Sequence, residues 1–194
     1  MGPESYARDI QETVHEWVGS DDPKGWSNQL KNEPTLVVAY ELKYRLWQTG
    51  FGHWPEFDII PHAGAALGNV YTYANAGAEI RFGYNLPLDF GTGPVRPVGE
   101  ATVSAADARS PSFGFHFFVG VDGRAVLQNI FLEGNTFTDS HEVDKKPFVA
   151  DIMAVASLKI KNFRLSYTHV FRTKEFDEQE EDQIFGSISL AYIF

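Results

Sequence analysis

Leu36-Val-Val-Ala-Tyr-Glu-Leu-Lys-Tyr-Arg-Leu-Trp47 is the stretch of sequence that decides the fold. Every second residue from Leu36 to Leu46 is apolar, whereas the residues between them include Glu41, Lys43 and Arg45. A period of two is typical of a β-strand with one apolar and one polar face. We therefore predict a strand here whose two faces differ in character.

The same alternation returns in four later stretches, where apolar residues again oppose charged or polar side chains. These stretches are 75–85, 148–161, 163–172 and 184–194. A strand of about 9 to 11 residues can cross a bilayer when tilted, whereas globular strands usually have about five or six. The pattern predicts an all-β fold, a transmembrane antiparallel β-barrel. A soluble barrel with its apolar face around a ligand remains the alternative.

Aromatic residues near the predicted strand ends favour the membrane over the soluble barrel. They are Trp47, Trp54, Tyr71, Tyr73 and Tyr192. Aromatic girdles at both membrane interfaces are typical of outer-membrane barrels.

The connections between strands predict the topology. Tight links are expected at 31–34, 68–70, 121–124, where Asp122-Gly123 is a turn signal, and 161–162. Long links are expected at 86–111, 133–146 and 174–183, with an intermediate one at 49–55. If all long links face outside, Gly25–Leu30 is a descending strand and the N-terminal segment is extracellular.

This gives about nine strands in residues 1–194, treated as one barrel domain. Bacterial single-chain barrels have even strand counts. We therefore expect the sequence to lack an odd number of leading strands, and the missing signal peptide suggests the same.

Composition excludes several functions. The net charge of −10 argues against binding nucleic acid, which needs a basic surface. The chain has no cysteine, which excludes disulfides, thiol catalysis and thiolate metal sites.

Residues 5–19 have the period of an amphipathic helix, with an apolar stripe of Ile10, Val14, Trp17 and Val18. Gln11 and His15 are four residues apart and therefore share one side of this helix. His15 has two interpretations. It is a hydrogen-bonding residue where the helix docks, which the residues alone favour, or a general base oriented by Gln11.

Other candidate sites are weaker. His62, His116 and His169 lie in predicted strands and can simply line the lumen or an interface. The loop 133–144 has enough oxygen atoms for a hard cation, but it lacks the spacing of an EF-hand, and a solvated loop is the preferred interpretation.

Several ordered motifs resemble one known family, the outer-membrane lipid A 3-O-deacylases, over essentially the whole chain. The motifs are Gln11-x-x-x-His15, Gly19-Ser20, Pro23-Lys-Gly-Trp-Ser-Asn-Gln-Leu-Lys-Asn-Glu-Pro34, Pro61-His62-x-Gly64, Leu67-Gly-Asn69, Arg81-x-Gly83, Phe131-Leu-Glu-Gly-Asn135 and Phe185-Gly-Ser-Ile-Ser-Leu190. The family is described as a twelve-stranded barrel of the bacterial outer membrane. About nine of those strands would be present here, as the strand count also suggests.

The resemblance implies a calcium-dependent ester hydrolase that removes the 3-linked acyloxyacyl group of lipid A in lipopolysaccharide. By motif, His15 is the general base, Gln11 is a supporting pocket residue, and Asp21 corresponds to an acidic residue of the site. The family's calcium ligands lie on leading strands that this sequence does not contain. We therefore expect an incomplete site with little or no activity in this chain alone.

Two further hypotheses stay open. The chain could be a non-enzymatic outer-membrane barrel, either a small pore or a surface-interaction protein, or it could be the soluble barrel. The Gln11/His15 helix favours the enzyme, because a plain pore does not need it. Expected partners are lipopolysaccharide and outer-membrane lipid, with no nucleic acid, and the expected oligomeric state is a monomer.

Overall fold

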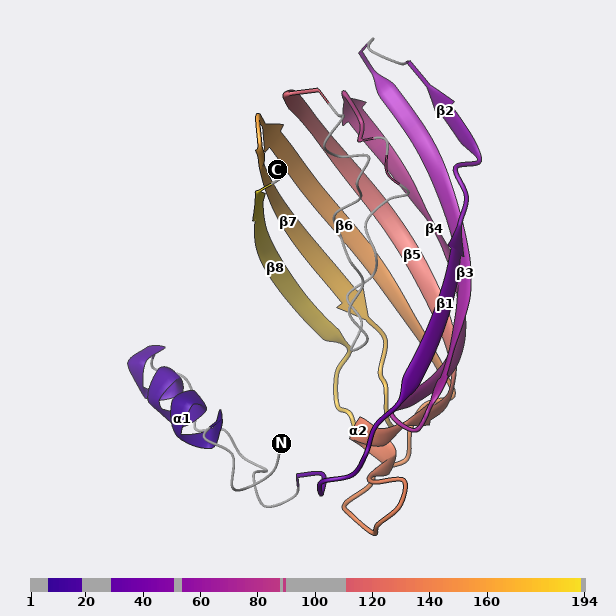
Figure 1. The fold of residues 1–194 in the computed structure, drawn as a ribbon, viewed down its shortest axis with the longest axis vertical. Coiled ribbons are helices and arrows are strands. Elements are labelled where there is room, and N and C mark those ends of the chain that lie inside the picture. Colours follow the sequence, from indigo (N-terminus) through magenta and orange to yellow (C-terminus); the bar gives the residue numbers. More distant parts are fainter. Residues whose placement is uncertain (1–6, 19–28, 51–53, 88, 90–110, 193–194) are drawn as a thin grey trace.

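The computed structural model describes residues 7–18, 29–50, 54–87, 89 and 111–192 (Figure 1). Most of them form one antiparallel sheet of eight strands. The strands are β1 (Val37–Lys43), β2 (Trp47–Thr49), β3 (Glu56–Gly68), β4 (Tyr71–Tyr84), β5 (Phe113–Asn129), β6 (Phe148–Ile160), β7 (Phe163–Arg172) and β8 (Gln183–Tyr192). The helices of the described part are α1 (Ala7–Val18) and α2 (Ile130–Glu133).

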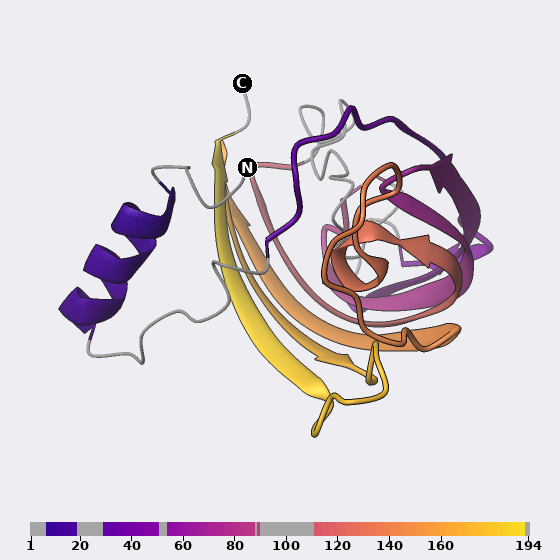
Figure 2. The same ribbon diagram turned by 90° about the horizontal axis from the view of Figure 1, so that it is seen from below.

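The sheet is strongly curved and wraps around a central space (Figures 1 and 2). Its strand order is β1-β3-β4-β5-β6-β7-β8, with β2 also paired to β3. Strands β1 and β8 lie at the two edges, and no backbone ladder joins them in the described part of the chain. The predicted antiparallel β architecture is confirmed, and the described residues form eight of its strands, where about nine were expected in the whole chain.

β1 and β2 together form one irregular edge strand. Lys43 pairs with His62, whereas Trp47 pairs with Ile59, so the register shifts by one residue between them. This irregularity lies opposite Pro61, which has no N–H to donate to the ladder. A β-bulge at such a position lets the pairing continue on both sides of the proline.

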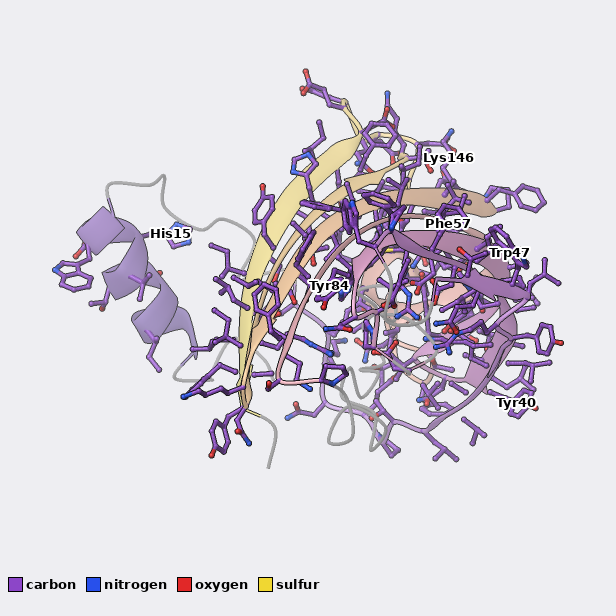
Figure 3. The ribbon with its side chains drawn as sticks, turned by 90° about the horizontal axis from the view of Figure 1, so that it is seen from above. His15, Tyr40, Trp47, Phe57, Tyr84 and Lys146 are labelled. Atoms are coloured by element: carbon purple, nitrogen blue, oxygen red, sulfur yellow. The ribbon has the colours of Figure 1, made fainter. Side chains whose placement is uncertain are left out.

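The two faces of the sheet have the predicted orientation. The outer face carries exposed apolar side chains such as Phe117, Val119 and Ile152, and Figure 3 shows Tyr40 on this outer side. The inner face carries buried charged side chains, which are Glu56, Asp58, Glu79, Arg81, Asp122, Arg124, Asp151 and Lys159. A wall that is apolar outside and ionic inside is the pattern of a transmembrane barrel.

The predicted turn at 121–124 is wrong. Asp122 and Gly123 lie inside β5, which runs without a break for 17 residues and pairs with β4 and β6 along both sides. Asp122 is almost fully buried and accepts a hydrogen bond from Asn75. The Asp-Gly pair is therefore a lumen-facing carboxylate followed by a small outward residue. Two predicted strands merge into one.

Most of the predicted strand at Gly25–Leu30 lies outside the described residues, since only Gln29 and Leu30 are described and neither is in a strand. Residues 31–34, the expected tight link, belong to a stretch without helix or strand, 29–36, that leads into β1. By contrast, the turns at 69–70 and 161–162 are confirmed.

The change of topology also moves one long connection. The connections 134–147 and 173–182 and the 69–70 turn lie at one end of the sheet, which we call the loop end. Because the strands alternate in direction, Tyr84 and Phe113, from which the 85–112 connection leaves and re-enters the sheet, lie at the opposite end, with the 161–162 turn. The expectation that all long connections share one side is therefore wrong for 85–112.

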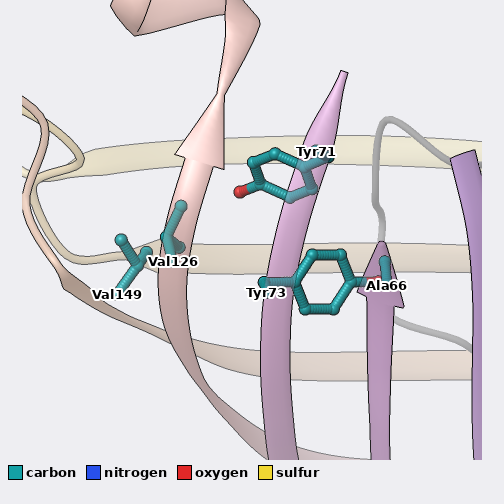
Figure 4. Close-up of a cluster of buried hydrophobic side chains, with 5 residues drawn as sticks. All are labelled: Ala66, Tyr71, Tyr73, Val126 and Val149. Atoms are coloured by element: carbon teal, nitrogen blue, oxygen red, sulfur yellow. The ribbon is translucent and has the colours of Figure 1, made fainter. Parts of the chain in front are cut away.

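The interior is packed with side chains at the loop end. Ala66, Tyr71, Tyr73, Val126 and Val149 form a buried cluster there (Figure 4), with the two tyrosine ring centroids 5.0 Å apart. Tyr71 and Tyr73 are therefore core residues and not the interfacial aromatics that the sequence predicted. Trp47, Trp54 and Tyr192 are exposed, as an interfacial role requires.

In the described residues, helices are all too short or too polar to span a membrane.

Candidate functional site

α1 carries the predicted catalytic residue. Residues 7–18 are helical, and the stripe residues Ile10, Val14 and Trp17 are exposed, with Trp17 at 91%. His15 lies on this helix and is partly exposed. In Figures 2 and 3 α1 lies apart from the curved sheet.

The structure describes the three predicted site residues to different extents. Gln11 and His15 do lie one turn apart on the same helix. The Gln11 side chain and the whole of Asp21 lie outside the described residues. The roles of all three therefore stay predictions, and so does their assembly into one site.

The segment that follows α1 toward the sheet is held at the loop end by side-chain hydrogen bonds. Asn135 accepts from the backbone N–H of Lys31 at 2.8 Å and donates to the carbonyl of the same residue at 2.9 Å. Glu33 accepts from the N–H groups of Thr136 and Phe137, both at 3.2 Å. Two segments more than 100 residues apart in sequence are thus joined.

Asn69 joins a third segment to this arrangement. Its side chain accepts from the N–H of Leu36 and donates to the carbonyl of Pro34, both at 2.8 Å. Its carbonyl accepts from the Thr136 hydroxyl at 3.0 Å. We call Glu33, Asn69 and Asn135 the loop-end clasp.

The local sequence explains how Asn135 is presented. Gly134 ends α2 with a φ of 76°, a conformation that a side chain would strain, and Ser140 then accepts from the Asn135 N–H at 2.7 Å. All three clasp residues lie in the sequence motifs quoted above, but the motifs alone assign them no role. Their spacing in sequence contains no sign that they meet.

Among the hollows near this end, one of about 660 Å³ lies between residues 29–35 and the residues Val70, Ile130 and Phe131. Another, of about 810 Å³, is lined largely by small or apolar residues of β4, β5 and β6, with Lys146 and Lys174 also at its edge. The exposure of Ala74, Ala76 and Ala150 in its lining places it on the outer wall, so lipid would fill it in a membrane.

The inner face contains two ionic groups. In the first, Arg81 donates to Asp58 at 2.9 and 2.6 Å and to Asp89 at 2.5 Å. Glu56 in turn accepts from the N–H groups of Asn85 and Leu86. The start of the 85–112 connection is therefore fixed against the inner wall.

In the second group, Asp151 accepts from both Arg124 and Arg172 at 2.8–3.1 Å. His62 lies 2.9 Å from Asp122, and its buried ring faces the lumen, as does that of His116. His169 is exposed on the outer face. Burial and mutual pairing give these groups a structural role, because buried charges persist where they are paired.

The described residues contain no cluster of metal-binding side chains. Nowhere in ranges 7–18, 29–50, 54–87, 89 and 111–192 do three His, Asp or Glu side chains converge. In the loop 133–144, Glu133 binds Lys145 at 2.5 Å and accepts from the N–H of Asn129. Calcium dependence therefore stays a prediction.

Comparison with known proteins agrees with this architecture. The family model described as "Outer membrane protein LpxR" matches residues 1–194. The solved structure of LpxR from Salmonella typhimurium superposes with a TM-score of 0.78 at 20% sequence identity, over 100% of this chain and 64% of that one. The chain thus spans less than two thirds of the length of that structure. Curated protein sequences give no match.

Proposed function

Since the chain belongs to the LpxR family of outer membrane proteins, we propose that it is the larger part of a lipid A 3-O-deacylase. The family match over residues 1–194 carries this proposal. Two features of the molecule support it. The sheet presents an apolar wall to lipid, and a helix with an exposed apolar stripe and a histidine precedes it.

His15 is the general base in this proposal. Its neutral imidazole takes a proton from a water molecule, and the resulting hydroxide attacks the carbonyl carbon of the 3-linked ester. The bond from that carbon to the sugar oxygen breaks, and the protonated imidazole returns its proton to the leaving oxygen. The products are an acyloxyacyl carboxylic acid and a free 3-hydroxyl on lipid A. Gln11, one turn away, holds the imidazole in its reactive orientation, and Asp21 is the acidic residue of the site.

The proposal also includes a dependence of the reaction on calcium. A cation beside the ester would stabilise the negative charge that develops on its carbonyl oxygen. The described residues offer no cation site, so we assign no step of this chain to the ion. We expect the 194-residue chain alone to release little acyl group for the same reason.

The experiment joins this chain to the part of Salmonella LpxR that it does not cover and measures 3-O-acyl release from lipid A by mass spectrometry. We expect His15→Ala to abolish release in the completed protein. His141→Ala is the matched control, because that histidine lies exposed in the loop 134–147, and it should keep full release. Unchanged release after His15→Ala would contradict the assignment, as would an inactive but folded completed protein.

The packed interior argues against an open pore. Arg81 binds Asp89 and the carbonyl of Pro87, at the start of the 85–112 connection, on the inner wall, and the Tyr71/Tyr73 cluster fills the loop end. We therefore expect no steady ion conductance from the chain in planar bilayers. Steady single-channel currents would favour the pore instead.

A further inference from the structure

The hollow of about 660 Å³ at the loop end has one polar and one apolar wall. Residues 29–35 form the polar wall, and Val70, Ile130 and Phe131 form the apolar wall. The volume is within the range of about 300–1,000 Å³ that is usual for sites of small ligands. Such a division suits a ligand that has a polar edge and an apolar face.

The polar wall offers hydrogen-bonding groups that the fold itself does not use. Gln29, Lys31, Asn32 and Thr35 line the hollow, and within the described residues their side chains make no hydrogen bond or ion pair. They supply two amides, one ammonium group and one hydroxyl, so that the wall can both donate and accept. A ligand with several hydroxyl groups can bind all four.

The loop-end clasp holds this wall in place. Asn135 binds the N–H and the carbonyl of Lys31, and Asn69 binds the backbone of the segment at 34–36. The Glu33 carboxylate accepts from two N–H groups of the loop 134–147. The backbone of the wall is thus fixed without a ligand, which reduces the entropy cost of binding one.

The apolar wall includes an exposed aromatic ring. Ile130 is 3% exposed and donates its N–H to the carbonyl of Val70 at 3.0 Å, so the floor of the hollow is buried and tied to the β3–β4 turn. Phe131, the next residue of α2, is 59% exposed. Figure 2 shows α2 over the space that the sheet encloses, and not on the outer side of the wall. An exposed ring away from the lipid-facing side is typical of a binding surface.

The two walls disfavour several classes of ligand. A hydrocarbon chain would desolvate the polar side chains of 29–35 without giving them partners. A metal ion would find no converging carboxylates in the part of the chain that the structure describes. The charges of Lys31 and Glu33 cancel, so the lining does not attract a strongly charged ligand.

We propose that this hollow binds neutral sugar residues of the oligosaccharide that lipopolysaccharide carries beyond lipid A. The C–H groups on the face of a sugar ring stack on Phe131, and the hydroxyl groups at its edge bind Gln29, Asn32 and Thr35. This inference rests on the proposed function, in which lipopolysaccharide is the substrate. It also places the loop end outside the cell, where outer-membrane barrels have their longer loops.

Binding of a free oligosaccharide tests the site without any hydrolysis. The probe is the lipid-free oligosaccharide that mild acid releases from lipopolysaccharide, with its phosphate groups removed. It is titrated by calorimetry into the full chain in detergent micelles. We expect Phe131→Ala to weaken binding about tenfold through loss of the stacked ring. We expect Asn32→Ala to weaken it about fivefold through loss of one hydrogen bond.

Phe137→Ala is the matched control. Phe137 is also an exposed aromatic residue of the loop end, at 65%, but it does not line this hollow. Its replacement should leave binding unchanged. The gel mobility shift of the folded barrel, retained in every variant, shows that the compared proteins are folded.

The inference is overturned if the phosphate-free probe does not bind the parent chain, or if Phe131→Ala and Phe137→Ala weaken binding equally. It is also overturned if only the phosphorylated probe binds, or if a long-chain fatty acid binds instead with the same dependence on Phe131. If the probe binds as expected while acyl release does not depend on His15, the sugar site stands and the proposed function fails. Release that depends on His15 without any binding of the probe gives the opposite result.

Discussion

Asp151 and Glu33 are both carboxylates that accept several hydrogen bonds, but they lie in opposite surroundings. Asp151 is 1% exposed on the inner face of the sheet and is bound by two guanidinium groups. Glu33 is partly exposed at the loop end and is bound by backbone N–H groups of a distant loop. The buried carboxylate stabilises the wall, whereas Glu33 fixes a segment outside it. Breaking the first should lower the stability of the whole sheet, and breaking the second should move one part of the protein.

The largest effect is expected for Asp151→Ala. The change leaves Arg124 and Arg172 without their common acceptor in the interior, and removing one partner of a buried ion pair costs about 3–5 kcal/mol. Urea unfolding in detergent micelles measures the loss. Asp151→Asn keeps one side-chain oxygen as an acceptor for the arginines and should therefore lose less stability. A stability equal to the parent protein in Asp151→Ala would refute the role of this group.

Gly77→Ala tests the inner packing on its own. A Cβ at Gly77 would clash with the carbonyl of Val121 and would lie 2.7 Å from the His62 ring. Overpacking of this kind costs about 1–3 kcal/mol. Gly123→Ala is the matched control, because a Cβ there meets nothing closer than 3.8 Å. Equal unfolding midpoints for the two variants would contradict the difference between the faces.

The clasp should depend on pH, whereas the inner wall groups are shielded from water. Since the pKa of Glu33 is lowered in the folded protein, its contribution is complete above the ordinary glutamate value and is lost as the pH falls through the lowered one. A spin-label distance between Asn32→Cys, next to Glu33, and Val121→Cys on β5 should therefore broaden only at acidic pH. Glu33→Gln should show the same breadth at every pH, and a pH response in that variant would assign the effect to another group.

The smallest effect is expected for Lys146→Met. Lys146 pairs with Asp177, and both side chains are substantially exposed at 40% and 55%. Surface pairs of this kind contribute about 0–1 kcal/mol, so the unfolding midpoint should hardly move. A loss as large as that of Asp151→Ala would show that exposure does not decide the energetics here.

The wall was predictable from sequence because each strand contains its own signal. The alternation in 36–46 or 148–160 fixes which face is apolar, and each residue adds to the same pattern. The Asp122-Gly123 turn was misread because a local turn signal competed with long-range pairing. Asp122 satisfies its carboxylate through Asn75, which lies 47 residues earlier, and no local pattern contains that contact.

The candidate site was only partly predictable. The helix and the spacing of Gln11 and His15 follow from local periodicity. The clasp does not, because Glu33, Asn69 and Asn135 meet only after β3, β4 and β5 have paired. Residues that act across more than 100 positions of sequence are visible in the fold alone.

The orientation of the wall is the claim on which the account depends, and spin-label accessibility along β5 tests it most directly. In the cysteine-free chain, single labels are placed at successive positions from Phe117 to Asp122 in a lipid bilayer. Collisions with oxygen, which concentrates in lipid, should be frequent at Phe117, Val119 and Val121 and rare at Phe118, Gly120 and Asp122. The reverse pattern, or equal accessibility at all six positions, would contradict a sheet whose apolar face meets lipid.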